Sequence, residues 1–102
     1  MRTFNLFPPQ RICVEIGIRI KRLRLAKNLT QLQLAQMAGS SLSSIRRLEA
    51  QGQGSFELVV RVAQALQAVD ALEALFVVPL LSIAQIEREA LLATRLRARG
   101  PK

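Results

Sequence analysis

The segment from Thr30 to Glu49, TQLQLAQMAGSSLSSIRRLE, constrains the fold of this chain more than any other stretch. Its first residue can cap a helix, and Gly39 stands where a left-handed backbone would end that helix. Ser41 can cap a second helix, in which Ile45 and Leu48 share one face. The segment therefore predicts two short helices joined by a tight turn, with the polar side of the second helix held out from a small apolar body.

Helical patterns continue on the N-terminal side. Pro9 can serve as a first-turn residue of a long helix, and Asn28 stands where its C-terminal cap is expected. The apolar residues of this helix recur at helical spacing and should face the core: Ile12, Ile16, Ile20 and Leu23.

The C-terminal side carries weaker signals. Residues 51–54, QGQG, predict a flexible loop, after which Ser55 can cap a fourth helix. Asp70 with Glu73 resembles a capping box for a short fifth helix. Pro79 then forbids a continuous helix. A sixth helix should follow Ser82 and fray into a basic tail that contains Arg95, Arg97, Arg99 and Lys102.

The central segment resembles the Cro/lambda-repressor (XRE) family of helix-turn-helix proteins. The family's run, TQ-x-x-LA-x-x-x-G-x-S-x-x-x-I-x-x-x-E, is matched by Thr30, Gln31, Leu34, Ala35, Gly39, Ser41, Ile45 and Glu49. The likeness extends from about Ile16 to Phe76. It implies an all-α fold: a five-helix lambda-repressor-like domain with an additional C-terminal helix and tail. The expected divisions are an N-terminal extension with the start of helix 1 (1–14), the DNA-binding domain (15–76), and a linker, helix and tail (77–102).

Charge is distributed unevenly along the chain. The net charge of +8 divides into +7 over residues 1–54, −3 over residues 55–87 and +4 over residues 88–102. The basic N-terminal half, which contains the helix-turn-helix, indicates a polyanion-binding face. The apolar, mildly acidic residues 55–87 indicate a surface that contacts another protein. The alternative is that the basic residues only keep an apolar protein soluble.

Other functions find little support in the composition. The chain has no His and a single cysteine, Cys13, which argues against a zinc or haem site and indicates a reducing, cytoplasmic setting. Neither a phosphate-binding glycine loop nor a nucleophile–base pair is visible, so we expect no enzyme and no cofactor. No apolar run approaches the ~20 residues that a membrane span needs. RNA binding is disfavoured because stacking aromatics are scarce.

The resemblance implies which residues would touch double-stranded DNA. Bases would be read by Leu42, Ser43, Arg46 and Arg47. Arg47 matches a base-contacting position in phage repressors, and an arginine can bridge O6 and N7 of guanine. Arg46 could equally bind a phosphate, and Leu42 could contact a thymine methyl group or pack against a partner. Phosphate contacts would come from Gln31, Ser40, Ser41, Ser44, Gln51 and Gln53.

Two further expectations concern structure and assembly. In phage repressors of this family the positions of Arg24 and Glu49 form an ion pair that orients the recognition helix. Such domains usually bind inverted repeats as homodimers, with half-site centres roughly 34 Å apart. The expected dimer surface is Leu72, Leu75, Phe76, Val77, Val78, Leu80 and Leu81. The alternative for these residues is packing within one chain around the fifth helix.

A narrower resemblance concerns the end of the chain. A short domain followed by LSIAQIEREALLATRLRAR is similar in layout to HipB-type proteins. That similarity implies a repressor of its own toxin–antitoxin operon, with a HipA-like kinase as partner and in some systems a further small protein. The alternative is an interaction module that neutralises or scaffolds the toxin, with DNA binding secondary. The tail could instead add phosphate contacts.

Overall fold

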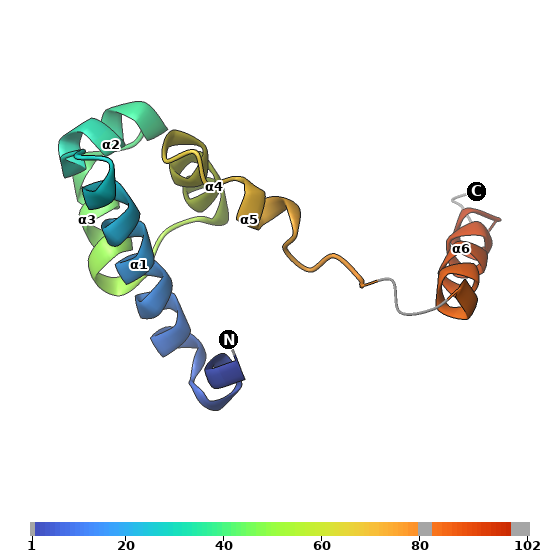
Figure 1. The fold of residues 1–102 in the computed structure, drawn as a ribbon. Coiled ribbons are helices and arrows are strands. Elements are labelled where there is room, and N and C mark those ends of the chain that lie inside the picture. The colour runs from blue at the N-terminus through green and yellow to red at the C-terminus, as the bar shows by residue number, and fades with distance from the viewer. Residues whose placement is uncertain (1, 80–82, 99–102) are drawn as a thin grey trace.

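The computed structural model of this chain describes residues 2–79 and 83–98, and these residues are helical or loop throughout. Figure 1 shows the order of the elements. They are the 3-10 helix η1 (Arg2–Leu6), α1 (Pro9–Ala26), α2 (Gln31–Ala38), α3 (Leu42–Gln51), α4 (Phe56–Ala65), α5 (Asp70–Glu73) and α6 (Ile83–Ala98). The all-α prediction is confirmed, with a helix-turn-helix bundle followed by a C-terminal helix.

Local signals set the ends of α1. Pro8 is the N-cap and Pro9 begins the helix. Proline is suited to this position because an N–H in the first turn has no acceptor within the helix, so its absence costs no hydrogen bond. Lys27 is the C-cap, and Asn28 follows with a left-handed φ of 57°. Asn28 therefore adopts the predicted conformation one residue beyond the cap.

The turn between α2 and α3 is also built from caps. The Thr30 hydroxyl accepts from the Gln33 amide at 3.0 Å, and the Gln33 side chain accepts from the Thr30 amide at 2.8 Å. Gly39 ends α2 at a φ of 66°, and Ser41 caps α3 by accepting from the Ser44 amide at 3.1 Å.

The end of α3 corrects one boundary. Gln51 is the last residue of the helix and does not lie in the loop, because Gly52, at a φ of 66°, is the C-cap whose amide bonds back to Leu48. The loop begins one residue later than the QGQG pattern indicates.

The core lies where α1, α2, α3 and α4 meet. The buried apolar side chains are Ile20, Leu34, Ala35, Ala38, Ile45, Leu48, Leu58, Val62 and Leu66. Ile16 packs against them, but Ile12 is only half-buried and Leu23 is 41% exposed. The prediction that Leu23 faces the core is wrong, because this side chain lines an open groove between α1 and α4.

A close approach of α1 to α3 tightens this core. Gly17 is buried, and a Cβ placed on it would overlap the carbonyl oxygen of Leu48. Only a residue without a side chain allows the two helices to come so near. The sequence pattern did not indicate this contact.

The fifth helix differs from its prediction. Ser55 caps α4 by accepting from the Leu58 amide at 3.0 Å, as expected. At α5, however, the N-cap is Val69, whose backbone is already helical, and no side chain caps the helix. The capping box expected at Asp70 is therefore wrong. Asp70 lies inside the first turn, where its negative charge interacts favourably with the positive end of the helix dipole.

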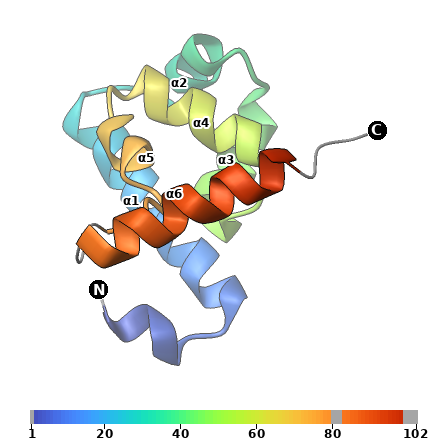
Figure 2. The same cartoon turned by 90° about the vertical axis from the view of Figure 1, so that its right-hand side faces the viewer.

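The last helix stands apart from the others in Figure 1, and in the turned view of Figure 2 it lies in front of the bundle. The Cα radius of gyration is 18.2 Å, whereas a compact domain of 100 residues has about 13 Å. The helix continues to Ala98, so the expected fraying from Arg95 onward is wrong over these residues. Among the described residues no helix is long and apolar enough to cross a membrane.

Candidate nucleic-acid interface

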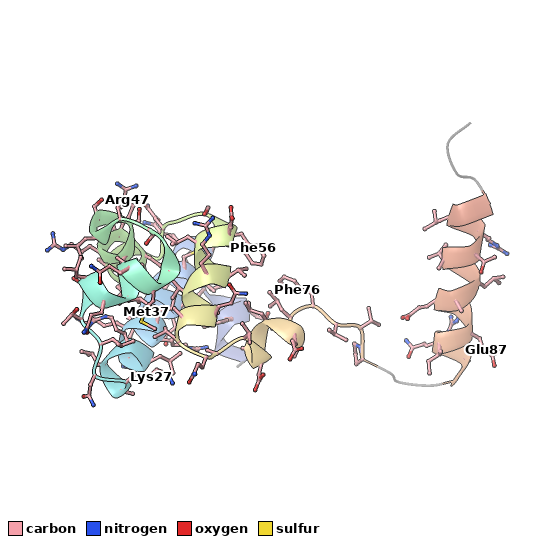
Figure 3. The ribbon with its side chains drawn as sticks, turned by 90° about the horizontal axis from the view of Figure 1, so that it is seen from above. Lys27, Met37, Arg47, Phe56, Phe76 and Glu87 are labelled. Atoms are coloured by element: carbon pink, nitrogen blue, oxygen red, sulfur yellow. The ribbon has the colours of Figure 1, made fainter. Side chains whose placement is uncertain are left out.

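The helix α3 has a buried side and an exposed side. Ile45, Leu48 and Glu49 are buried, while three of the residues expected to read bases, Ser43, Arg46 and Arg47, are exposed. Figure 3 shows Arg47 projecting outward from the bundle. The fourth, Leu42, is half-buried at the first position of the helix. The bundle thus presents two guanidinium groups from one short helix.

A buried ion pair fixes α3 to α1. Arg24 Nε donates to Glu49 Oε2 at 2.7 Å, and Arg24 Nη2 donates to Glu49 Oε1 at 3.0 Å. The two side chains are only 7% and 2% exposed. Arg24 Nη1 also donates to the carbonyl of Leu29 at 2.7 Å. This two-point geometry and the third hydrogen bond compensate the desolvation of both charges.

Gln31 joins the same network. Its Nε2 donates to Glu49 Oε1 at 3.0 Å, although the residue is expected to contact phosphate. One of its amide hydrogens is therefore committed to holding α2 against α3. A phosphate would be met by the other amide hydrogen or by backbone N–H groups of the first turn of α2.

Several expected DNA-contacting residues surround one open cavity of about 300 Å³. Ser40, Ser44, Arg47 and Gln53 all line it, and so do Ser55 at the capped start of α4 and the acidic Glu57. Hydroxyls, an amide, a guanidinium and a helix N-terminus are all groups that bind phosphate oxygens.

The other expected phosphate contacts lie outside this cavity. Gln51 is exposed at the end of α3. The Ser41 hydroxyl is occupied locally: it caps α3, and its Oγ lies 2.8 Å from Ser44 Oγ and 3.2 Å from Ser43 Oγ.

Sequence reasoning missed Arg61, which belongs to the acidic middle of the chain but lines the cavity. Its Nη2 donates to Glu57 Oε2 at 2.8 Å, and its Nη1 reaches the carbonyl of Gly39 at 3.5 Å. The i,i+4 spacing to Glu57 was the only local signal, and it predicts an ordinary surface pair. The contact to Gly39 places a cation beside the turn between α2 and α3.

The expected dimer surface is largely exposed. Phe76 is 91% exposed, Val77 63% and Val78 57%, while Leu75 is 41% exposed and Leu72 is half-buried. Leu80 and Leu81 lie outside the described residues.

Comparison with protein families matches the Helix-turn-helix family over residues 20–73, more than half of the chain. The chain therefore belongs to the XRE-type helix-turn-helix family, and it is a DNA-binding transcription regulator. The matched residues run from within α1 to the end of α5 and so include the whole interface described above. A comparison with curated proteins found no match.

Proposed function

We propose that this regulator is a sequence-specific transcriptional repressor that reads the major groove with the exposed side of α3. The observation that carries the proposal is that one side of α3 is fixed to the bundle while its opposite side is exposed. Glu49 ties α3 to Arg24, while Arg46 and Arg47 on the same helix stay exposed. A recognition helix needs both, because base discrimination depends on arginines held in a fixed orientation.

Within this proposal Arg47 is the main base reader and Ser43, Leu42 and Arg46 are its neighbours in the groove. Contacts to the DNA phosphates would position the protein on the duplex. They would come from Gln31, Ser40, Ser44 and Gln53, with Ser41 and Gln51 at the two ends of α3. We add Arg61 to these proposed phosphate contacts, since it lines the same cavity as Ser40 and Arg47.

Selection from randomised duplexes, followed by anisotropy titration of the selected site, tests the proposal. Arg47→Ala should cost about 1–3 kcal/mol, or roughly 5- to 150-fold in affinity, and should relax the preference at one base pair. The matched control is Arg88→Ala, an exposed arginine on α6. An unchanged base preference in the Arg47 variant would show that the readout is assigned wrongly.

We also propose that the repressor binds inverted repeats as a homodimer, with the exposed apolar residues after α5 at or near its interface. One helix-turn-helix covers about half an operator, and half-sites should lie roughly 34 Å apart. Binding should weaken steeply as salt rises, because phosphate contacts release counterions.

The narrower prediction, a repressor of its own toxin–antitoxin operon with a HipA-like kinase as partner, rests on the layout of the chain end. The exposed apolar side chains of α6 also suit a protein contact. Co-purification with the product of the neighbouring gene tests it. If deleting residues 82–102 leaves that complex intact, the C-terminal segment is not the toxin-binding element.

A further inference from the structure

An apolar groove opens between α1, α4 and α5 on the side of the bundle that carries no expected DNA contact. It encloses about 430 Å³. Leu23, Phe56 and Leu75 lie along it and are 41%, 66% and 41% exposed. Among the described residues that line it, Arg19 is the only charged one. An exposed hollow of this kind marks a site that another apolar surface covers.

The helix α6 carries an apolar stripe that nothing in the described chain covers. Ile86, Ala93 and Leu96 follow one another at i, i+7 and i+10, and they share one side of the helix. Ile86 is 42% exposed and Leu96 62%. A helix with such a stripe is suited to lie in an apolar groove, anchored by residues at these spacings.

Charge is also complementary between the two surfaces. Glu89 lies within the apolar stripe of α6, three residues after Ile86. On the groove, the Arg19 guanidinium bonds Glu15 through Nε at 3.1 Å, while its Nη2 is buried without a hydrogen-bond partner among the described residues. The Arg19 side chain is still 37% exposed, so a carboxylate entering with the stripe would join the Arg19–Glu15 pair at the only charged residue among the described lining of the groove.

We propose that α6 of one copy docks into the α1–α4–α5 groove of a second copy, and that the exchange is reciprocal. Each copy supplies one groove and one helix, so a twofold arrangement covers both apolar surfaces in both chains. This deepens the homodimer proposed above by naming the surfaces that meet, and it rests on that proposal.

The described residues that follow α5 favour exchange over docking within one chain. Phe76, Val77 and Val78 are more than half exposed, and the chain runs through them away from the bundle (Figures 1 and 3). In an exchanged dimer two such segments cross near the twofold axis and can cover each other. Docking within one chain offers these side chains no second copy of the segment to pack against.

Cross-linking between two differently tagged preparations tests the exchange in the absence of DNA. Both carry Cys13→Ser; one also carries Ala63→Cys in the groove and the other Ala93→Cys on the stripe. The matched control replaces Ala93→Cys by Ala84→Cys, nine residues away and so about 180° round the helix. We expect a mixed disulfide dimer with Ala93→Cys in several-fold excess over the control.

Two outcomes would overturn the proposal. One is an equal or absent yield of mixed dimer with the two alanine positions. The other is a disulfide that forms only within a chain carrying both Ala63→Cys and Ala93→Cys, which would place α6 in its own groove.

Light scattering of the intact chain provides a second measurement. Leu96→Asp, on the stripe, should raise the dimer dissociation constant about tenfold or more, whereas Leu91→Asp, on the opposite side, should leave it near the wild-type value. A monomeric wild-type chain, or equal effects of the two variants, would contradict the exchange. DNA selection with Arg47→Ala is read separately, so failure of the dimer and failure of base reading are distinguishable.

Discussion

The helices α3 and α6 have similar amino-acid compositions but different surroundings. Both contain several large apolar residues, and both carry exposed arginines. In α3 the apolar side is buried, with Ile45 fully enclosed and Leu48 2% exposed, whereas every described side chain of α6 except the half-buried Gln85 is exposed. The difference teaches that the sequence of a helix can predict the helix without showing which surface will cover its apolar residues.

The largest expected effect concerns the buried ion pair that α3 forms with α1. Glu49→Ala should lower the free energy of unfolding by about 3–5 kcal/mol, because it leaves the charge of Arg24 buried without its carboxylate partner. The matched control on α6 is Glu87→Ala, which should change stability by less than about 0.5 kcal/mol. Urea denaturation measures both. Equal effects would mean that α3 is no more firmly anchored than α6.

Truncating one isoleucine in each helix sharpens the same comparison. Ile45→Ala should cost about 2–5 kcal/mol at any protein concentration, since it opens a cavity in the core. Ile86→Ala should act only through the dimer, so its effect on the thermal midpoint should shrink on dilution. A concentration-independent loss from Ile86→Ala would place that residue in the core of its own chain.

The approach of α1 to α3 can be tested at Gly17. Alanine in a helix normally gains about 0.5–1 kcal/mol over glycine, but here the added methyl overlaps backbone and should cost about 1–3 kcal/mol. Gly54→Ala is the control, because its methyl would meet side-chain ends and no backbone: the Leu58 side chain at 3.1 Å and the Leu48 side chain at 3.6 Å. Stabilisation by Gly17→Ala would show that α1 and α3 can separate without cost.

The smallest expected effect separates two neighbouring serines at the start of α3. Ser41→Ala removes the N-cap and should cost about 1 kcal/mol. Ser43→Ala, in the exposed first turn, should be nearly neutral in chemical denaturation and should act on DNA affinity only. A neutral Ser41→Ala would mean that tertiary packing alone holds the start of the recognition helix.

Most of the helix ends could be predicted because caps act within a few residues. The structure contains the expected caps at Thr30, Ser41 and Ser55, and the expected Arg24–Glu49 pair came from the family resemblance. The expectation failed at Asp70, because Val69 was already helical. A capping pattern does not show where the preceding turn stops.

The contacts that sequence reasoning missed join residues far apart in the chain. Gln31 bonds Glu49 across 18 positions, and Arg61 reaches Gly39 across 22. No short-range sequence pattern, such as helical spacing, predicts contacts between residues so far apart. The exposure of Leu23 belongs to the same class, since it depends on how α4 lies against α1.

By itself, the sequence determined the helices, the turn at Gly39 and the family, because spacing and capping are local properties. Only the tertiary structure decided which arginines are structural and which are exposed. Arg24 is buried against Glu49, while Arg46 and Arg47 remain in water. The reason is the crossing of α1 and α3 at Gly17, which sets the side of each helix that loses its solvent.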